Sequence, residues 1–74
     1  MTVSDIIHNY NFTADFPFVV RVTNGYGEII EEFYSCEDVP KWTYNKEVIY
    51  MNCVNGYGEF SNMAVMVIDI FTED

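Results

Sequence analysis

Four short runs of this chain are rich in apolar residues and are long enough to form strands. The first run, residues 18–23, alternates, with Phe18, Val20 and Val22 on one side and Val19, Arg21 and Thr23 on the other. Such alternation is typical of a strand with one buried face. Three further strands are predicted over residues 28–36, 47–54 and 63–71.

The first ten residues show a helical spacing instead. Residues 2–5, Thr-Val-Ser-Asp, have the form of a capping box, and Ile6, Ile7 and Tyr10 follow at helical intervals. A short N-terminal helix is therefore predicted. Its apolar stripe must lie on another apolar surface, because two or three isolated turns are not stable in water.

The pentapeptide Asn-Gly-Tyr-Gly-Glu occurs twice, at residues 24–28 and 55–59, each time directly after a predicted strand. Asparagine and glycine both tolerate the positive φ that tight chain reversals need. The repeat predicts two hairpins, one joining residues 18–23 to 28–36 and one joining residues 47–54 to 63–71.

The first hairpin can be given a register. A four-residue loop over residues 24–27 sets Thr23 opposite Glu28 and Val22 opposite Ile29. Phe33 then shares the face of Val20, but Glu31 also points inward. An edge position for this strand or a one-residue bulge would relieve that conflict.

The second hairpin gives one wholly apolar face if Val54 lies opposite Met63. In that register Cys53 meets Ala64, and Ile49 and Met51 meet Ile68 and Met66. Residues 55–62 are then expected to form an eight-residue loop.

The opposite face of the second hairpin is more apolar than a solvated face needs to be. It carries Tyr50, Val65 and Val67. Two explanations stay open: the sheet is buried on both sides within the chain, or a partner covers this face. A second copy of the chain is one such partner, and these three residues are our candidate self-association face.

The predicted architecture is a single small α+β domain over residues 1–74. It has a short N-terminal helix and a four-stranded antiparallel sheet made of two hairpins. A short helical turn lies between the hairpins, where Pro40 follows two acidic residues. Trp42 and Tyr44 are expected to cover one end of the core.

Charge excludes several classes of partner. Twelve acidic residues face three basic ones, which gives a net charge of −9 in 74 residues. Such a surface repels nucleic-acid backbones and anionic membranes. The longest apolar run, residues 63–68, is too short to span a bilayer, and the N-terminus lacks a secretion signal. We therefore expect a cytoplasmic protein.

The residue types that carry common chemistries are isolated in this sequence. Cys36 and Cys53 are interpreted as reduced packing residues, with a disulfide as the less favoured alternative. His8 has no second metal ligand at a suitable spacing. The paired glycines lack the third glycine and the lysine of a phosphate-binding loop. We predict no metal, no cofactor and no enzyme activity.

The best candidates for function are aromatic and acidic residues near the two repeats. Exposed aromatic side chains beside carboxylates can bind a protein partner. The candidate contacts are Tyr26, Tyr57, Phe60, Glu28, Glu31, Glu32, Glu37 and Asp38. The alternatives are that the aromatic rings pack on their own strands and that the carboxylates form a solvated face. A further hypothesis is that the acidic residues imitate the charge of nucleic acid.

Three segments carry a resemblance to a class of known proteins. They are residues 2–7 (Thr-Val-Ser-Asp-Ile-Ile), residues 18–22 (Phe-Val-Val-Arg-Val), and residues 37–40 (Glu-Asp-Val-Pro) followed by Glu47-Val48. Together they resemble small acidic proteins of phages and conjugative elements of low-GC Gram-positive bacteria. This resemblance implies an accessory protein of a mobile element. We predict a non-catalytic interaction module whose acidic surface binds a basic host or element protein, and an inhibitor is one form of this hypothesis. The alternative is a structural homo-oligomer that pairs through the outer sheet face or a strand edge.

Overall fold

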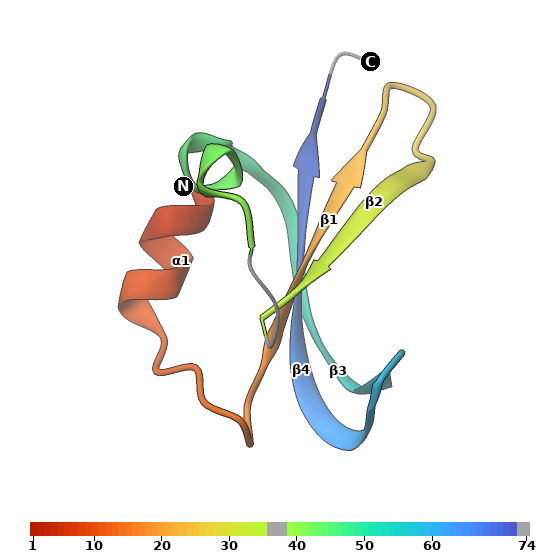
Figure 1. The fold of residues 1–74 in the computed structure, drawn as a ribbon. Coiled ribbons are helices and arrows are strands. Elements are labelled where there is room, and N and C mark those ends of the chain that lie inside the picture. The colour runs from red at the N-terminus through yellow and green to blue at the C-terminus, as the bar shows by residue number, and fades with distance from the viewer. Residues whose placement is uncertain (36–38, 73–74) are drawn as a thin grey trace.

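Two strands with apolar residues on both faces form the middle of a four-stranded sheet. In the computed structural model, which describes residues 1–35 and 39–72, β1 (Phe18–Thr23) and β4 (Phe60–Phe71) lie side by side and run parallel. β2 (Ile29–Tyr34) pairs antiparallel with β1, and β3 (Val48–Tyr57) pairs antiparallel with β4. The strand order is β2-β1-β4-β3 (Figure 1).

The predicted α+β class, with one short helix and four strands, is confirmed, but the prediction of a purely antiparallel sheet is wrong. The sheet is mixed, because the central strands β1 and β4 point the same way. For that to happen, the chain must return from the end of β2 to the opposite end of the sheet before β3 begins (Figure 1). The segment that contains the 3-10 helix η1 (Lys41–Asn45) makes this return.

The N-terminal helix α1 (Val3–Asn9) starts at the predicted capping box. The hydroxyl of Thr2 accepts a hydrogen bond from the Asp5 N–H, and the Asp5 carboxylate accepts one from the Thr2 N–H at 3.0 Å. Val3 and Ile6 are fully buried against one face of the sheet. Packing of that stripe, more than the helix itself, keeps so short a helix folded.

The main core lies between α1 and the sheet. The strand side chains on this face come from β1 and β4, and they alternate as the sequence predicted. They are Phe18, Val20, Val22, Met66, Ile68 and Ile70.

The helix η1 covers one end of this core (Figure 1). Pro40 occupies its N-cap position, and the buried Thr43 hydroxyl donates to the Pro40 carbonyl at 2.7 Å. Tyr44 packs against the core, while Trp42 stays half exposed and meets Phe33 edge-on with ring centroids 6.2 Å apart. η1 therefore covers the core as expected, although Trp42 lies at its margin.

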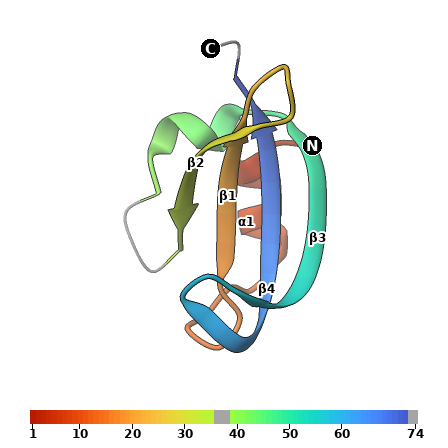
Figure 2. The same cartoon turned by 90° about the vertical axis from the view of Figure 1, so that its right-hand side faces the viewer.

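The opposite face of the sheet is closed by the chain itself. The end of the β3–β4 hairpin curls across this face toward β2 (Figure 2). Phe60 is thereby buried with Val19, Val65 and Val67. Its ring lies edge-on to the ring of Tyr34, with the two ring centroids 5.5 Å apart. Val65 and Val67 are thus covered within the chain, which corrects the prediction that they form a self-association face. Tyr50, the third member of that face, is 53% exposed.

The register of the first hairpin differs from the expected one by two residues. Val20 lies opposite Phe33, and Val22 lies opposite Glu31. The shift is even, so Phe33 still shares the face of Val20. A bulge beside Val22 leaves Ile30 as an extra residue on β2, and Glu31 is exposed on this edge strand.

The second hairpin is also shifted by two residues. Met51 lies opposite Ile68 and Cys53 opposite Met66, so both still belong to the predicted face. A bulge at Ile49 breaks the pattern, and this side chain is 57% exposed. Val48 takes the expected place of Ile49 on the core face, opposite Ile70.

The expected eight-residue loop over residues 55–62 does not form. β3 continues to Tyr57, which lies opposite Phe60, and the chain turns at Gly58 and Glu59. Gly58 has φ +53°, and a Cβ atom there would lie only 2.6 Å from the Tyr34 hydroxyl oxygen. Because glycine has no Cβ atom, the end of this hairpin can lie against Tyr34 and fold over the sheet.

The expectation that both cysteines pack in the core fails for Cys53. Its thiol is free and exposed on the outer strand β3. Cys36 lies outside the described residues.

Candidate protein-binding surface

The loop between β1 and β2 holds Tyr26 away from the rest of the molecule. The Asn24 Oδ1 atom accepts hydrogen bonds from the N–H groups of Tyr26 at 2.9 Å and Glu28 at 3.0 Å. The Asn24 carbonyl accepts another from Gly27, whose φ is +79°. Tyr26 is 90% exposed on this loop, so its ring is available to a partner while the loop backbone is already held by hydrogen bonds.

Carboxylates follow the same loop into the edge strand β2. Glu28, Glu31 and Glu32 are all exposed. Glu28 accepts a hydrogen bond from the Asn24 side chain at 3.1 Å, which ties the first carboxylate to the Tyr26 loop. We name Tyr26, Glu28, Glu31 and Glu32 the acidic edge.

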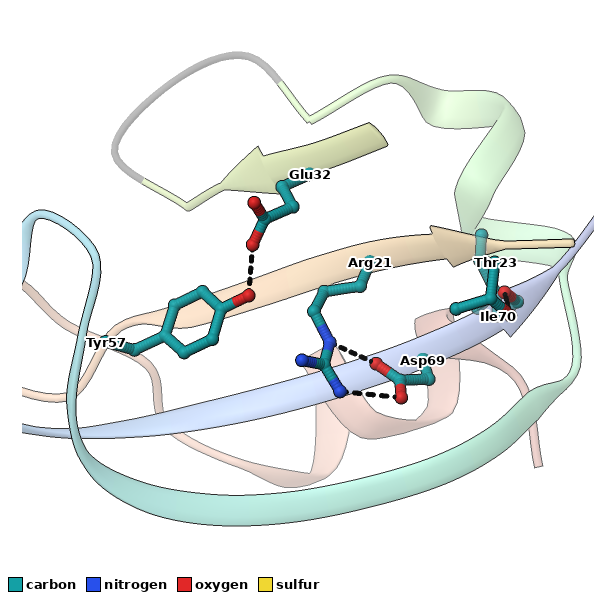
Figure 3. A network of polar contacts seen from close by, with 6 residues as sticks. All are labelled: Arg21, Thr23, Glu32, Tyr57, Asp69 and Ile70. Carbon is teal, nitrogen blue, oxygen red and sulfur yellow. Dashed lines mark hydrogen bonds and ion pairs between the residues drawn. The ribbon is translucent and has the colours of Figure 1, made fainter. Parts of the chain in front are cut away.

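Arg21, which lies opposite Glu32 on the neighbouring strand, does not neutralise the acidic edge, because the Asp69 carboxylate binds its guanidinium group. Arg21 donates from Nε to Asp69 Oδ1 at 2.6 Å and from Nη2 to Asp69 Oδ2 at 2.8 Å (Figure 3). This two-point contact raises the pKa of Arg21 above its usual value, although partial burial opposes the rise. The other two basic residues, Lys41 and Lys46, lie on and directly after η1.

A row of polar side chains crosses the face opposite α1 at paired positions of the four strands. Arg21 on β1 pairs with Glu32 on one side and with Asp69 on the other, and Asp69 pairs in turn with Tyr50. In strand order the row is Glu32, Arg21, Asp69 and Tyr50. The row thus links the acidic edge to the centre of the sheet.

Tyr57 connects the curled end of the β3–β4 hairpin to this row. Its hydroxyl donates a hydrogen bond to the Glu32 carboxylate, and its ring lies 5.8 Å from the Arg21 guanidinium carbon (Figure 3). Partial burial, followed by the bond to Glu32, raises the pKa of Tyr57. Tyr57 therefore fixes the hairpin end over the sheet.

The structure brings together only part of the predicted contact set. Tyr26, Glu28, Glu31 and Glu32 share one edge of the molecule, and Tyr57 touches that edge through Glu32. Phe60 is buried beneath the curled hairpin, which does not favour it as a partner contact. The predicted contacts Glu37 and Asp38 lie outside the described residues.

Sequence reasoning missed the pairing of Arg21 with Asp69. A usable signal was present, because each is the single charged residue in an otherwise apolar or uncharged strand, and the two charges are opposite. Two such strands are natural neighbours, since a buried charge needs a partner.

A shallow pocket of about 360 Å³ lies beside the start of β1. Its walls are Phe12, Thr13, Ala14, Pro17, Phe18, Ser35 and Phe60. None of these side chains is an acid or base near neutral pH. The Ser35 hydroxyl already accepts a hydrogen bond from the Phe18 N–H at 3.1 Å. The pocket thus offers no group for acid–base chemistry.

The described part of the chain shows no cluster of three His, Cys, Asp or Glu side chains that could hold a metal ion. His8 lies on α1 with its Nδ1 atom 3.3 Å from the Ser4 hydroxyl. Within residues 1–35 and 39–72, no helix has the length and apolar content needed to cross a membrane.

Comparison with known proteins adds no relative: no family model, no curated protein and no solved structure matches this chain.

Proposed function

We propose that this chain is a non-catalytic interaction domain that binds a basic protein through its acidic edge. It would act as an accessory protein of a mobile element, with a host or element protein as its partner. The observation that carries the proposal is the exposure of three carboxylates, Glu28, Glu31 and Glu32, along the loop end and edge strand that follow the 90% exposed Tyr26, while Arg21 on the neighbouring strand is occupied by Asp69.

Charge favours a cationic partner over a neutral one. The molecule carries a net charge of −9, so a basic protein is attracted before contact and associates faster at low salt. Tyr26 then supplies an aromatic contact at the end of the charged strip, and tyrosine is enriched among residues that dominate binding energy.

Side-chain contacts suit this edge better than strand addition. The extra residue Ile30 distorts β2, and Glu31 and Glu32 place charges along it. Bulges and charges both protect an edge strand against pairing with another strand. We therefore assign the contact to the side chains of the acidic edge.

A short oligolysine peptide, followed by NMR of the intact domain, tests the proposal. Amide shifts should change at Tyr26, Glu28, Glu31 and Glu32, and binding should weaken as salt rises. Replacing the three glutamates by glutamine should weaken binding about tenfold, since each exposed charge contact contributes a few tenths to about 1 kcal/mol.

A matched control separates this edge from net charge. The triple variant Asp15→Asn, Glu47→Gln, Glu59→Gln removes the same three charges elsewhere, so both variants carry −6 instead of −9. Equal weakening in the two variants would show that only overall charge matters and would count against the acidic edge. Displacement of a short DNA duplex from the same peptide would favour the form of the proposal in which the domain imitates nucleic acid.

A further inference from the structure

The second edge of the sheet, β3, differs from the acidic edge in its charge. Residues 48–58 contain no Asp, Glu, Lys or Arg, although the chain as a whole carries −9. Exposed side chains of this strand include Tyr50, Asn52, Cys53 and Asn55. An open edge without charges lacks the usual protection against pairing with another strand.

The start of β3 is already covered on its outer side by the N-terminus. The Val48 N–H donates to the Met1 carbonyl at 2.8 Å, and the Val3 N–H donates to the Lys46 carbonyl at 3.1 Å. Beyond the bulge at Ile49, β3 pairs regularly with β4 from Tyr50 to Asn55. No other described strand pairs with the outer side of this stretch.

Hydrogen bonds between β1 and β4 determine which β3 groups point outward. The Met66 N–H donates to the Pro17 carbonyl at 3.1 Å, and the Thr72 N–H donates to the Thr23 carbonyl at 2.9 Å. The backbone N–H and C=O groups of even-numbered residues in β4 therefore point toward β1. The backbone N–H and C=O groups of odd-numbered residues in β4 must then point toward β3, because these groups alternate in direction along a strand.

The partners of those odd-numbered residues follow from the register. Asp69, Val67 and Val65 lie opposite Tyr50, Asn52 and Val54, whose backbone groups therefore point inward to β4. The backbone N–H and C=O groups between them point to the open side. These belong to Met51, Cys53 and Asn55. The outward N–H of Val48, opposite Ile70, fits the same alternation.

We propose that a second copy of this chain adds to the β3 edge, antiparallel and two-fold symmetric, with Cys53 opposite Cys53 of the other copy. This register alone uses all three outward residues of each chain, because Met51 then pairs with Asn55 across the axis. It forms about six backbone hydrogen bonds and joins two four-stranded sheets into one. It also leaves the two acidic edges at opposite ends, as far apart as the joined sheet allows. The inference goes beyond the proposed function and does not depend on it.

Amide hydrogen exchange of the natural chain tests this register directly. At high protein concentration the amides of Met51, Cys53 and Asn55 should be protected, and on dilution they should exchange rapidly. The amides of Tyr50, Asn52 and Val54 should stay protected at both concentrations, since they bond to β4. Fast exchange of the first three at every concentration overturns the proposal.

Light scattering supplies the second measurement. The natural chain should show twice the mass of its 8.6 kDa monomer at high concentration. The fraction of dimer should increase as salt rises, because screening weakens the repulsion between two acidic copies. This salt dependence is opposite to that expected for a basic partner. Failure of one proposal can therefore be told from failure of the other.

Two variants with the same net charge complete the test. Cys53→Glu places two carboxylates face to face at the two-fold axis and should shift the protein to monomer. Asn11→Glu adds the same charge on an exposed position outside the sheet and should leave the dimer unchanged. Circular dichroism checks that both variants fold. A monomer in the natural chain, or a dimer that persists in Cys53→Glu, overturns the proposed interface.

Discussion

Arg21 and Asp69 form a two-point ion pair across the two parallel central strands, on the face away from α1. The pair lies at directly neighbouring positions, and the side chains are only 21% and 12% exposed. Charges at this depth lose much of their hydration, so each depends on the other for compensation.

Removing one member of the pair should destabilise the domain more than removing both. Asp69→Ala leaves the Arg21 guanidinium without its partner. We expect the free energy of unfolding to fall by about 2 kcal/mol, a value between those for exposed and buried pairs. The double variant Arg21→Met, Asp69→Leu should recover most of that loss, because it leaves no unpaired charge. Urea unfolding measures both. If the double variant is as unstable as the single one, packing rather than charge compensation explains the pair.

Gly58 should be the least replaceable glycine of the described chain. An alanine there must adopt φ +53° and also place its Cβ 2.6 Å from the Tyr34 hydroxyl oxygen. Gly27 is the matched control, since its φ is +79° but no atom lies within 4 Å of the added Cβ. We expect Gly27→Ala to cost about 1 kcal/mol and Gly58→Ala at least about 1 kcal/mol more. Thermal unfolding compares them, and equal losses would mean that Tyr34 moves aside freely.

The two copies of Asn-Gly-Tyr-Gly-Glu show how far local sequence determines this fold. At residues 24–28 the Asn24 side chain organises a loop, as turn chemistry predicts. At residues 55–57 the same residues continue β3, and the turn comes later. The second copy differs in its surroundings, since Tyr57 reaches Glu32 and Phe60 fills the space above Val65 and Val67. These contacts join residues far apart in the sequence, so a local pattern could not reveal them.

The helix and the core face were predictable because each depends on a short-range pattern. The capping box at Thr2 and Asp5 and the alternation of Phe18, Val20 and Val22 appear as expected. The parallel pairing of β1 with β4 was not predictable from the two hairpins alone. It depends on contacts between residues far apart along the chain, such as the ion pair of Arg21 with Asp69 and the ring contact of Trp42 with Phe33.

The candidate surface was predicted in part for the same reason. Tyr26 and its neighbouring glutamates follow from loop chemistry and charge, so the sequence located them. Burial of Phe60 required knowledge that the second hairpin folds over the sheet.

Tyr57 should make stability fall at alkaline pH. Its pKa in the folded state is raised above the usual value of 10.0, first by partial burial and then by the bond to Glu32. The folded state therefore holds this proton more tightly than the unfolded chain does. The stabilisation is complete below pH 10 and is lost as pH rises through the raised pKa. Unfolding between pH 8 and about pH 12 should show a shallower decline for Tyr57→Phe than for the natural chain. Identical slopes would exclude Tyr57 as the titrating group.

Asp5 should act in the opposite pH range. Its pKa is lowered below 3.8 in the folded state, mainly because the carboxylate accepts a hydrogen bond from the Thr2 N–H. The unfolded chain thus binds the proton more readily, so the stabilisation is present above about pH 4 and is lost as pH falls through the lowered pKa.

Asp5→Asn is the variant that isolates this effect. It should lower the melting temperature at pH 7 and match the natural chain at strongly acid pH, where Asp5 is protonated in both states. Asn9→Ala serves as the control, because it changes an exposed α1 residue outside the capping box and should change stability equally at both pH values. A difference between Asp5→Asn and the natural chain that persists unchanged in acid would show that the carboxylate contributes through shape rather than charge, and that the capping box at Thr2 does not depend on ionisation.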